Sequence, residues 1–260
     1  MILKFSTKEN FEKWLNGQTL PSGIVVYVSD DETMYFTTNN IKGELKTYKC
    51  EKEEPIQPYN LVYSTNAAGS TITVNGETVT LEQGENIVLD YPNDITSVKA
   101  SNNKALTYIQ IPNTVTSIGE DAFLGCSSLV SVNIPESVKS IGNGAFYECK
   151  KLASINIPES VKTIDVYAFD NCTALASVTL PNSLSSIGDS AFNSCKSLLS
   201  ITIPNSVTSI DGYAFANCSK LTDFNYNGTT AQWPSITLVT DWKYNAPFTV
   251  VHCTDGDVTL

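Results

Sequence analysis

Leu129-Val-Ser-Val-Asn-Ile-Pro-Glu-Ser-Val-Lys-Ser-Ile-Gly-Asn-Gly-Ala-Phe-Tyr-Glu-Cys-Lys-Lys151 is one unit of a 23-residue repeat, and this stretch decides the fold. The opening leucine recurs at a constant interval, at Leu106, Leu129, Leu152, Leu175, Leu198 and Leu221. The shared pattern is Leu-x-x-Ile-x-Ile-Pro-x-x-Val-x-x-Ile-Gly-x-x-Ala-Phe-x-x-Cys-x-x, where x is variable. Self-similarity at one fixed period is typical of proteins whose short units stack on each other. The sequence therefore predicts five tandem repeats over residues 106–222.

The first part of each unit has the pattern of a short β-strand. Val132 and Ile134 alternate with Ser131 and Asn133, which places the apolar pair on one face and the polar pair on the other. Pro135 follows and ends the strand, because proline has no N–H to donate to a neighbouring strand. Each unit is expected to add one parallel strand with its apolar side chains turned inward.

The rest of each unit returns the chain to the start of the next strand. The apolar residues Val138, Ile141, Phe146 and Cys149 are spaced too irregularly for a long helix, so we expect turns with a short helical piece at Ala-Phe. Equivalent residues of successive coils should stack into ladders, since no single unit can bury its apolar face alone. The predicted fold is a leucine-rich repeat solenoid, a right-handed coil with a parallel β-sheet and with turns and short helical pieces on the return side.

The repeated pattern Ile-Pro-x-x-Val-x-x-Ile-Gly-x-x-Ala-Phe-x-x-Cys closely resembles the BspA-like, Treponema-type leucine-rich repeat family of bacterial surface proteins. Residues 225–233, Trp242 and residues 251–256 are similar to the ending common in that family, so the resemblance covers about residues 106–260. It implies adhesion or binding to host or bacterial surface components, an extracellular or cell-surface location, and no catalytic residues. The sequence shows neither a signal peptide nor a membrane span, which departs from the usual secreted pattern.

The sequence before the repeats is expected to form a small strand-rich α+β region. In residues 1–60, the pattern predicts a short helix at about 7–16 and a hairpin of 23–28 with 33–37, and the acidic, proline-rich residues 51–60 are the best linker candidate. This leader also resembles attachment modules of phage tail proteins.

Residues 61–105 and 223–260 are interpreted as the two caps of the solenoid. In the first, Asn75-Gly76 predicts a hairpin turn, and residues 86–105 read as a truncated repeat in which Leu89, Tyr91 and Pro92 take the places of Val132, Ile134 and Pro135. In the second, four aromatic residues are expected to close the last coil, namely Trp233, Trp242, Tyr244 and Phe248.

Two positions that recur in every repeat, one of cysteine and one of glycine or aspartate, are interpreted as structural. The residues that share one such position are called a column. Cys126, Cys149, Cys172, Cys195 and Cys218 recur with the repeat and lack the close pairing of a zinc site or disulfide framework, so they are expected to be buried thiols. Another column contains Gly119, Gly142, Gly188, Asp165 and Asp211, residue types that tolerate a left-handed backbone.

The charged residues of the sequence disfavour two classes of binding partner, nucleic acids and anionic membranes. All 16 basic residues are lysines and the net charge is −11, so the chain has no basic surface for nucleic acid or for anionic membranes. We therefore expect neither nucleic-acid binding nor membrane insertion. No cofactor or metal site is expected.

An enzyme is not expected from this sequence. His252 is the single histidine and adjoins Cys253, but neighbouring residues of a strand point to opposite faces, which disfavours a Cys/His dyad. Phosphate-binding loops, nucleophile elbows and His-Glu-x-x-His motifs do not occur.

Binding through the outward residues of the strands is the function that the pattern favours, with a protein or a glycan as ligand. These candidate binding residues form two stripes and are Tyr108, Gln110, Ser131, Asn133, Ser154, Asn156, Ser177, Thr179, Ser200, Thr202, Asp223 and Asn225. Most are small polar residues without the Trp and Arg anchors of strong interfaces, so weak or multivalent attachment fits better than tight binding. The alternatives are a merely solvated sheet face, and a structural component of an appendage or phage tail that docks through the N-terminal region.

Overall fold

The computed structural model describes residues 2–5, 25–28, 33–36, 61–89 and 95–260, and the chain divides into two compact units, Met1–Gln57 and Pro58–Leu260. In the first unit, β1 (Ile2–Phe5) pairs in parallel with β2 (Val25–Val28), which pairs antiparallel with β3 (Thr33–Phe36). The β2–β3 pair is the hairpin predicted from the sequence. The predicted helix at 7–16 and the linker at 51–60 lie outside the described residues.

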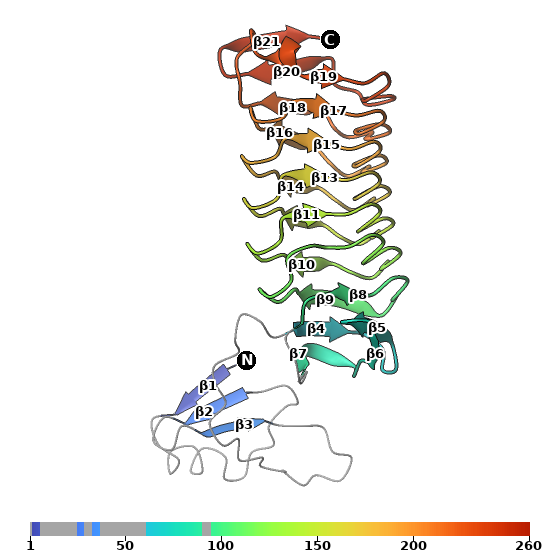
Figure 1. Cartoon of the computed structure of the whole chain (residues 1–260), viewed down its shortest axis with the longest axis vertical. Coiled ribbons are helices and arrows are strands. Elements are labelled where there is room, and N and C mark those ends of the chain that lie inside the picture. The colour runs from blue at the N-terminus through green and yellow to red at the C-terminus, as the bar shows by residue number, and fades with distance from the viewer. Residues whose placement is uncertain (1, 6–24, 29–32, 37–60, 90–94) are drawn as a thin grey trace. The chain divides into compact units, whose positions relative to one another are not determined.

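The second unit is a solenoid in which each coil contributes one strand to a front sheet (Figure 1). These front strands are β9 (Leu106–Gln110), β10 (Ser131–Asn133), β12 (Ser154–Asn156), β14 (Ser177–Thr179), β16 (Ser200–Ile203) and β18 (Asp223–Tyr226). Equivalent residues pair in parallel, as Ser131 does with Tyr108 and Ser154 with Ser177. Continuous pairing stops between β10 and β12 and between β14 and β16. The stacking of one strand per repeat confirms the predicted fold class.

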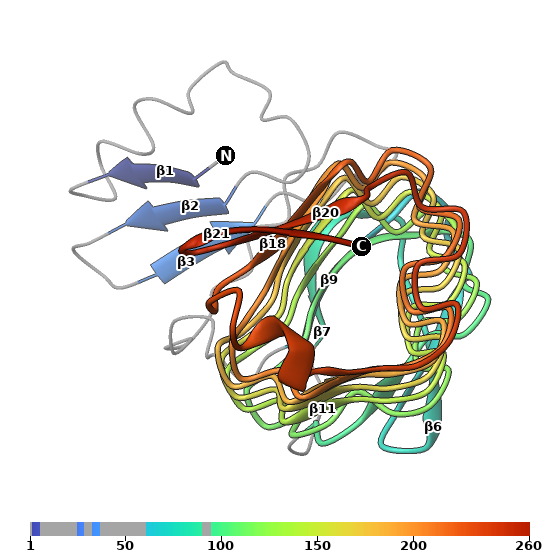
Figure 2. The same ribbon diagram turned by 90° about the horizontal axis from the view of Figure 1, so that it is seen from above.

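The return side of the coil carries a second parallel sheet, which the sequence analysis did not predict. Its strands lie in chain order and are β11 (Ser140–Ile141), β13 (Thr163–Ile164), β15 (Ser186–Ile187), β17 (Ser209–Ile210) and β19 (Thr237–Leu238). Figure 2 looks along the solenoid and shows the coils superposed, with front and return strands on different sides. Two-residue strands are too short to show a periodic pattern, which explains why spacing alone did not reveal them.

The expected helical piece at Ala-Phe is wrong, because this segment consists of turns. Ala145 N–H donates to Gly142 O within the turn (3.1 Å), whereas Phe146 N–H donates to Ala168 O of the next coil (2.8 Å). A helix would satisfy its N–H groups internally, but here they join successive coils. In the described residues the single helix is the 3₁₀ turn η1 (Trp233–Ser235).

The repeat phenylalanines form a stacked ladder through the centre of the solenoid. Phe169 lies 5.3 Å from Phe146 and 5.2 Å from Phe192 between ring centroids, and the interplanar angles are 4° and 8°. The rings are fully buried together with the leucine and isoleucine ladders. This arrangement confirms the predicted inward orientation of the repeat phenylalanines.

The five repeat cysteines are buried free thiols, as predicted. Each thiol donates to the carbonyl oxygen of the phenylalanine or alanine one coil earlier, for example Cys172 Sγ to Phe146 O at 3.1 Å. Burial raises the pKa of Cys126 and of Cys218 to about 12. These thiols act as small core residues that also satisfy a carbonyl group.

The glycine and aspartate column has a different role from the predicted left-handed turn. Positive φ occurs two residues later, at Asp121, Gly144, Tyr167, Ser190 and Tyr213. Gly142 and Gly188 instead allow close approach of neighbouring coils, whereas Gly119 has open space around it. A Cβ at 188 would lie 2.8 Å from the carbonyl carbon of residue 165 and 2.9 Å from the nitrogen of residue 166, both backbone atoms of the preceding coil.

The N-terminal cap departs from the predicted truncated repeat. β4 (Leu61–Thr65) pairs antiparallel with β9, and β7 (Gly84–Leu89) pairs antiparallel with β4. Leu89 therefore does not occupy a repeat-strand position, while Tyr91 and Pro92 lie outside the described residues. The first repeat strand has no preceding coil that could supply a parallel partner. Antiparallel strands from the cap pair with it instead.

The predicted Asn75-Gly76 hairpin is confirmed. It joins β5 (Thr71–Val74) to β6 (Glu77–Thr80), with positive φ at both turn residues. β8 (Val98–Lys99) adds to β5 as an antiparallel third strand. Positive φ at two central residues is the geometry that Asn-Gly favours in two-residue turns.

The C-terminal cap closes the last coil with aromatic rings and two strands, β20 (Val250–Cys253) and β21 (Gly256–Thr259). Trp233, Trp242 and Phe248 are buried against Phe224, as predicted. The prediction is wrong for Tyr244, whose side chain is 53% exposed.

Candidate binding face

The twelve predicted binding residues lie on the front strands β9, β10, β12, β14, β16 and β18. They form two stripes because the strands stack with equivalent positions in register. The first stripe holds Tyr108, Ser131, Ser154, Ser177, Ser200 and Asp223, and the second holds Gln110, Asn133, Asn156, Thr179, Thr202 and Asn225. We call this surface the strand face.

The strand face is exposed while the residues between its stripes are turned inward. Ser154 and Asn156 are exposed, whereas Ile155 between them is 4% exposed. Tyr108, Gln110 and Asn225 are half-buried, and the other nine residues are exposed. Alternation along each strand therefore follows from the pleat, which sends successive side chains to opposite faces.

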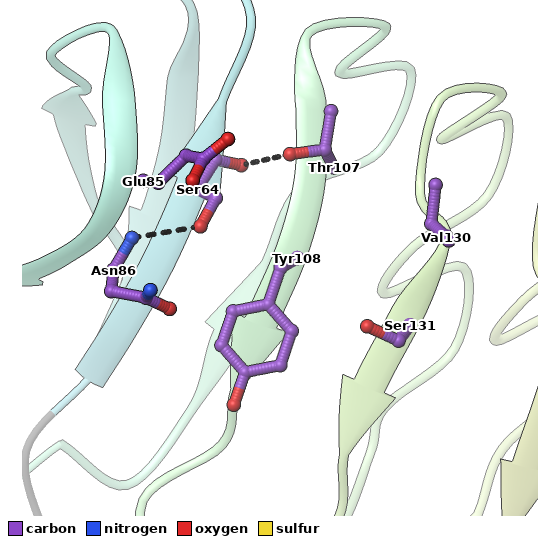
Figure 3. A pocket seen from close by; sticks show the side chains of 7 residues that line it. All are labelled: Ser64, Glu85, Asn86, Thr107, Tyr108, Val130 and Ser131. Carbon is purple, nitrogen blue, oxygen red and sulfur yellow. Dashed lines mark hydrogen bonds between the residues drawn. The ribbon is translucent and has the colours of Figure 1, made fainter. Parts of the chain in front are cut away.

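A shallow depression lies at the N-terminal end of the strand face (Figure 3). It has a volume of about 310 Å³ and is lined by Ser64, Glu85, Asn86, Thr107, Tyr108, Val130 and Ser131. Asn86 N–H donates to Ser64 Oγ (2.9 Å), and Thr107 Oγ1 donates to Ser64 O (3.1 Å). These bonds fix one wall, and the Tyr108 ring provides the largest apolar surface in the depression.

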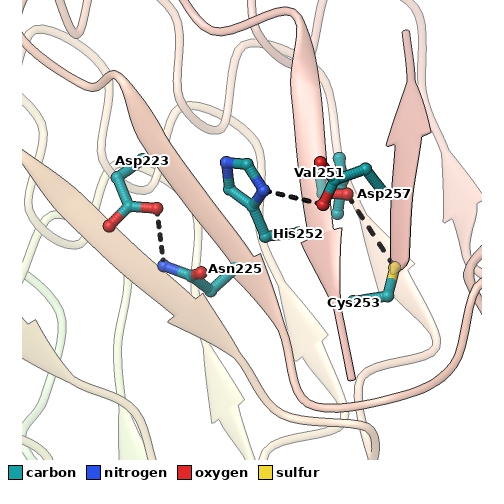
Figure 4. A network of polar contacts seen from close by, with 6 residues as sticks. All are labelled: Asp223, Asn225, Val251, His252, Cys253 and Asp257. Carbon is teal, nitrogen blue, oxygen red and sulfur yellow. Dashed lines mark hydrogen bonds and ion pairs between the residues drawn. The ribbon is translucent and has the colours of Figure 1, made fainter. Parts of the chain in front are cut away.

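The strand face continues beyond the predicted residues at its C-terminal end. His252 pairs with Asn225 and so extends the second stripe, a position that the sequence did not predict for it. His252 Nδ1 and Asp257 Oδ1 are 2.9 Å apart, and Asn225 Nδ2 donates to Asp223 Oδ1 at 3.0 Å (Figure 4). No 23-residue spacing connects His252 to the stripe, so periodicity alone did not reveal it.

An apolar column borders the strand face and was also missed. It lies one residue before the first stripe and contains Val130, Ala153, Ala176 and Leu199, all exposed. Leu199 is 56% and Val130 47% exposed. The column offers apolar contact area beside the polar stripes. Its signal in the sequence is the recurrence of apolar residues at a variable position of the repeat, the position directly after the opening leucine.

The side chains of the strand face are polar and almost all uncharged. Asp223 is the single acidic or basic residue among its twelve members, and the remainder offer hydroxyl and amide groups that donate and accept hydrogen bonds. In the described ranges, no group of three or more His, Cys, Asp or Glu side chains is placed to hold a metal ion. Among the same residues, no helix has the length and hydropathy of a membrane span.

Comparison with known families identifies the repeats. A family model described as the BspA type leucine-rich repeat region matches residues 94–222 in six copies. Five of these copies correspond to the complete repeats that begin at Leu106, and the sixth lies upstream of them. The upstream extension is consistent with the hydrogen bond from Ala100 N–H to Ala122 O, which repeats the bond from Phe123 N–H to Ala145 O one coil later. No curated protein matches the sequence significantly.

Solved structures with similarity to this chain are bacterial leucine-rich repeat proteins. A leucine-rich repeat protein of T. pallidum is 29% identical over 63% of this chain and 80% of its own, with a TM-score of 0.45. One from Bacteroides ovatus is 34% identical over 54% of this chain and 41% of its own, with a TM-score of 0.43. A leucine-rich cell surface protein of Faecalibacterium prausnitzii is 21% identical over 72% of this chain and 76% of its own, with a TM-score of 0.33.

Proposed function

Because residues 94–222 belong to the BspA-type leucine-rich repeat family, we propose that this protein is a non-enzymatic binding module that recognises a protein or glycan surface through the strand face. The observation that carries the proposal is the alignment of two exposed polar stripes across six strands. Repeat architectures use such extended surfaces for recognition. The family resemblance also supports a location at the cell surface.

The composition of the strand face supports weak contacts repeated along the solenoid. Its serine, threonine and asparagine side chains each offer both donors and acceptors of hydrogen bonds, and Tyr108 is its single aromatic residue. A ligand with its own repeating groups would make the same contact on successive coils, and the combined affinity would exceed that of any single contact. A polysaccharide or a repetitive protein surface has this property.

One further observation favours a second candidate function. Residues 1–57 form a compact unit separate from the solenoid. Such a unit is suited to attach the solenoid to a larger assembly, so the alternative is a structural or attachment component of an appendage or phage tail. Deletion of residues 1–57 separates the two functions, because ligand binding by the strand face would persist whereas incorporation into an assembly would be lost.

An arginine pair on the strand face tests the main proposal. The parent protein is first applied to arrays of extracellular proteins and of bacterial and host glycans. Ser177→Arg combined with Thr202→Arg should abolish binding to the hits, because long charged side chains would cover the stripes. Both positions are exposed, so folding should be retained.

Asn205→Arg serves as the matched control, since Asn205 is exposed in the turn that follows the strand and lies outside both stripes. It should leave binding intact. If the arginine pair and the control bind every array ligand as the parent does, the strand face is not the recognition surface.

A further inference from the structure

A second surface of the solenoid combines exposed aromatic rings with negative charge. It lies on the turns that follow the return strands, away from the residues of the strand face. Tyr167, Tyr213 and Tyr244 are 43%, 44% and 53% exposed and are the most exposed aromatic side chains of the described residues. We call the turns that carry these three residues the tyrosine edge.

The rings of the tyrosine edge are arranged in two perpendicular pairs. Tyr167 and Tyr147 have ring centroids 6.5 Å apart at an interplanar angle of 88°, and Tyr213 and Tyr244 have centroids 6.3 Å apart at 72°. In such a pair, one ring presents its edge to the face of the other, so the partner ring covers only one of the four ring faces. Each pair therefore forms a corner with two aromatic faces.

Two of these tyrosines occupy backbone positions that aromatic residues rarely adopt. Tyr167 and Tyr213 have φ of 56° and 55°, in the left-handed region. The same position in other coils holds Asp121, Gly144 and Ser190, residues of small side chain. Bulky residues in this region are outliers, so a requirement other than turn formation accounts better for the two tyrosines.

Carboxylates lie near both tyrosine pairs: Asp241 near Tyr213, and Asp170 and Glu148 near Tyr147, where Lys150 pairs with Glu148 at 3.3 Å. Tyr213 hydroxyl donates to Asp241 Oδ2 at 3.4 Å, and Asp189 Oδ2 lies beside Gly212, the residue before Tyr213. The turn residues 119–121, 142–144, 165–167, 188–190, 211–213 and 239–241 include six acidic residues and no lysine. The nearby Lys243 is engaged elsewhere, because its Nζ donates to Phe248 O (3.3 Å) and lies over that ring.

We propose that the tyrosine edge docks a basic, extended peptide segment of a partner protein. The faces of tyrosine rings attract Arg and Lys side chains, and the carboxylates add charge complementarity for a cationic partner. Tyr167 and Tyr213 are separated by two coils, about 10 Å at the spacing of paired strands, which neighbouring basic side chains of one extended peptide can span. Anionic polymers are repelled by the same carboxylates.

The test uses the full chain and a fluorescent peptide of alternating arginine and serine, with fluorescence anisotropy as the readout at physiological ionic strength. The parent should bind this peptide and should not bind the matched peptide of alternating glutamate and serine. The triple variant Tyr167→Ala, Tyr213→Ala and Tyr244→Ala should weaken binding by about tenfold or more, the product of modest losses at three exposed rings.

Two matched variants distinguish ring recognition from general attraction to an acidic protein. Replacement of the same three tyrosines by phenylalanine should keep the affinity within about twofold, because the ring faces remain. Tyr108→Ala on the strand face should also leave peptide binding unchanged. A circular dichroism spectrum identical to that of the parent shows that each variant is folded.

Three outcomes would overturn the proposal. They are failure of the parent to bind the basic peptide, equal affinity of the alanine variant and the parent, and loss of affinity in the phenylalanine variant to the same extent as in the alanine variant. Tyrosine-dependent binding of a neutral oligosaccharide without binding of the basic peptide would assign the edge to a glycan instead. The strand-face proposal is unaffected by any of these results, because its arginine variants alter other residues.

Discussion

The stacked phenylalanines of the repeats are among the largest fully buried side chains, and Phe169 lies in the middle of their ladder. Phe169→Ala would remove both stacking partners at once, 5.3 Å and 5.2 Å away. We expect a loss of about 3–5 kcal/mol in the free energy of unfolding, as for other large core truncations. Ser177→Ala on the strand face should change that free energy by no more than about 0.5 kcal/mol. Urea denaturation checks both values, and equal losses would mean that the inward and outward faces are exchanged.

Asp170 is a buried carboxyl group with a pH-dependent effect on stability. It is 7% exposed, and burial raises its pKa from 3.8 to about 6, although the hydrogen bond from Asn193 Nδ2 (3.0 Å) acts in the opposite direction. A folded-state pKa above the unfolded one means that the folded protein binds the proton more tightly. The stability that the folded protein gains from protonation of Asp170 is therefore complete below about pH 4 and is lost as pH rises through about 6.

Asp170→Asn tests this effect. The variant keeps an oxygen that accepts the Asn193 bond but has no charge to bury, so it should exceed the parent in stability at pH 7.5 by on the order of 2 kcal/mol. At pH 4 the two proteins should be about equally stable. Unfolding in urea at both pH values gives the comparison, and a difference that does not change with pH would refute the assignment. Asp165→Asn, at an exposed aspartate, is the control.

Alternation of apolar and polar residues in the sequence was sufficient to predict which strand residues turn inward. Val132 and Ile134 differ from Ser131 and Asn133 in polarity, and the pleat converts that difference into inward and outward faces. The role of Gly188 was not predictable in the same way. Its close contact involves backbone atoms of the preceding coil, and a sequence does not show how closely two coils approach.

The turns after the return strands provide a matched comparison at the scale of the element. Gly188→Ala would place a Cβ 2.8 Å from a backbone carbon of Asp165, whereas a Cβ at Gly119 would have no atom within 4 Å. We expect Gly188→Ala to cost about 1–3 kcal/mol, since neighbouring backbone would have to move. Gly119→Ala should stay within about 0.5 kcal/mol. Thermal unfolding of the two variants distinguishes them, and similar midpoints would show that the coils can separate without cost.

Elements that depend on contact between coils were harder to predict than the front strands. The return strands contain only two residues each, such as Ser140 and Ile141, and they are strands because the next coil supplies hydrogen-bond partners. The Ala-Phe turn follows the same rule, since Phe146 N–H bonds to the next coil and not to its own segment. The spacing of the apolar residues, from which a short helical piece was expected at Ala-Phe, does not show these contacts between coils.

At the scale of the molecule, a regular 23-residue period was enough to predict a stacked coil, because each unit needs its neighbours to bury its apolar residues. The caps were less predictable. The front strands are preceded by the antiparallel strands β7 and β4 and followed by β20 and β21, and neither end repeats the unit. For the same reason the sequence predicted the two polar stripes but missed His252, which joins the second stripe by strand pairing.

The claim that ligands bind to the strand face can be tested by site-specific photo-crosslinking. A photoreactive phenylalanine analogue is placed at Asn156 in the second stripe, and at Asn205 outside both stripes in a control protein. Both side chains are exposed, so each label faces solvent. With a ligand found on the arrays, the label at position 156 should form a covalent complex and the label at position 205 should not. Crosslinking from position 205 without crosslinking from position 156 would contradict the claim.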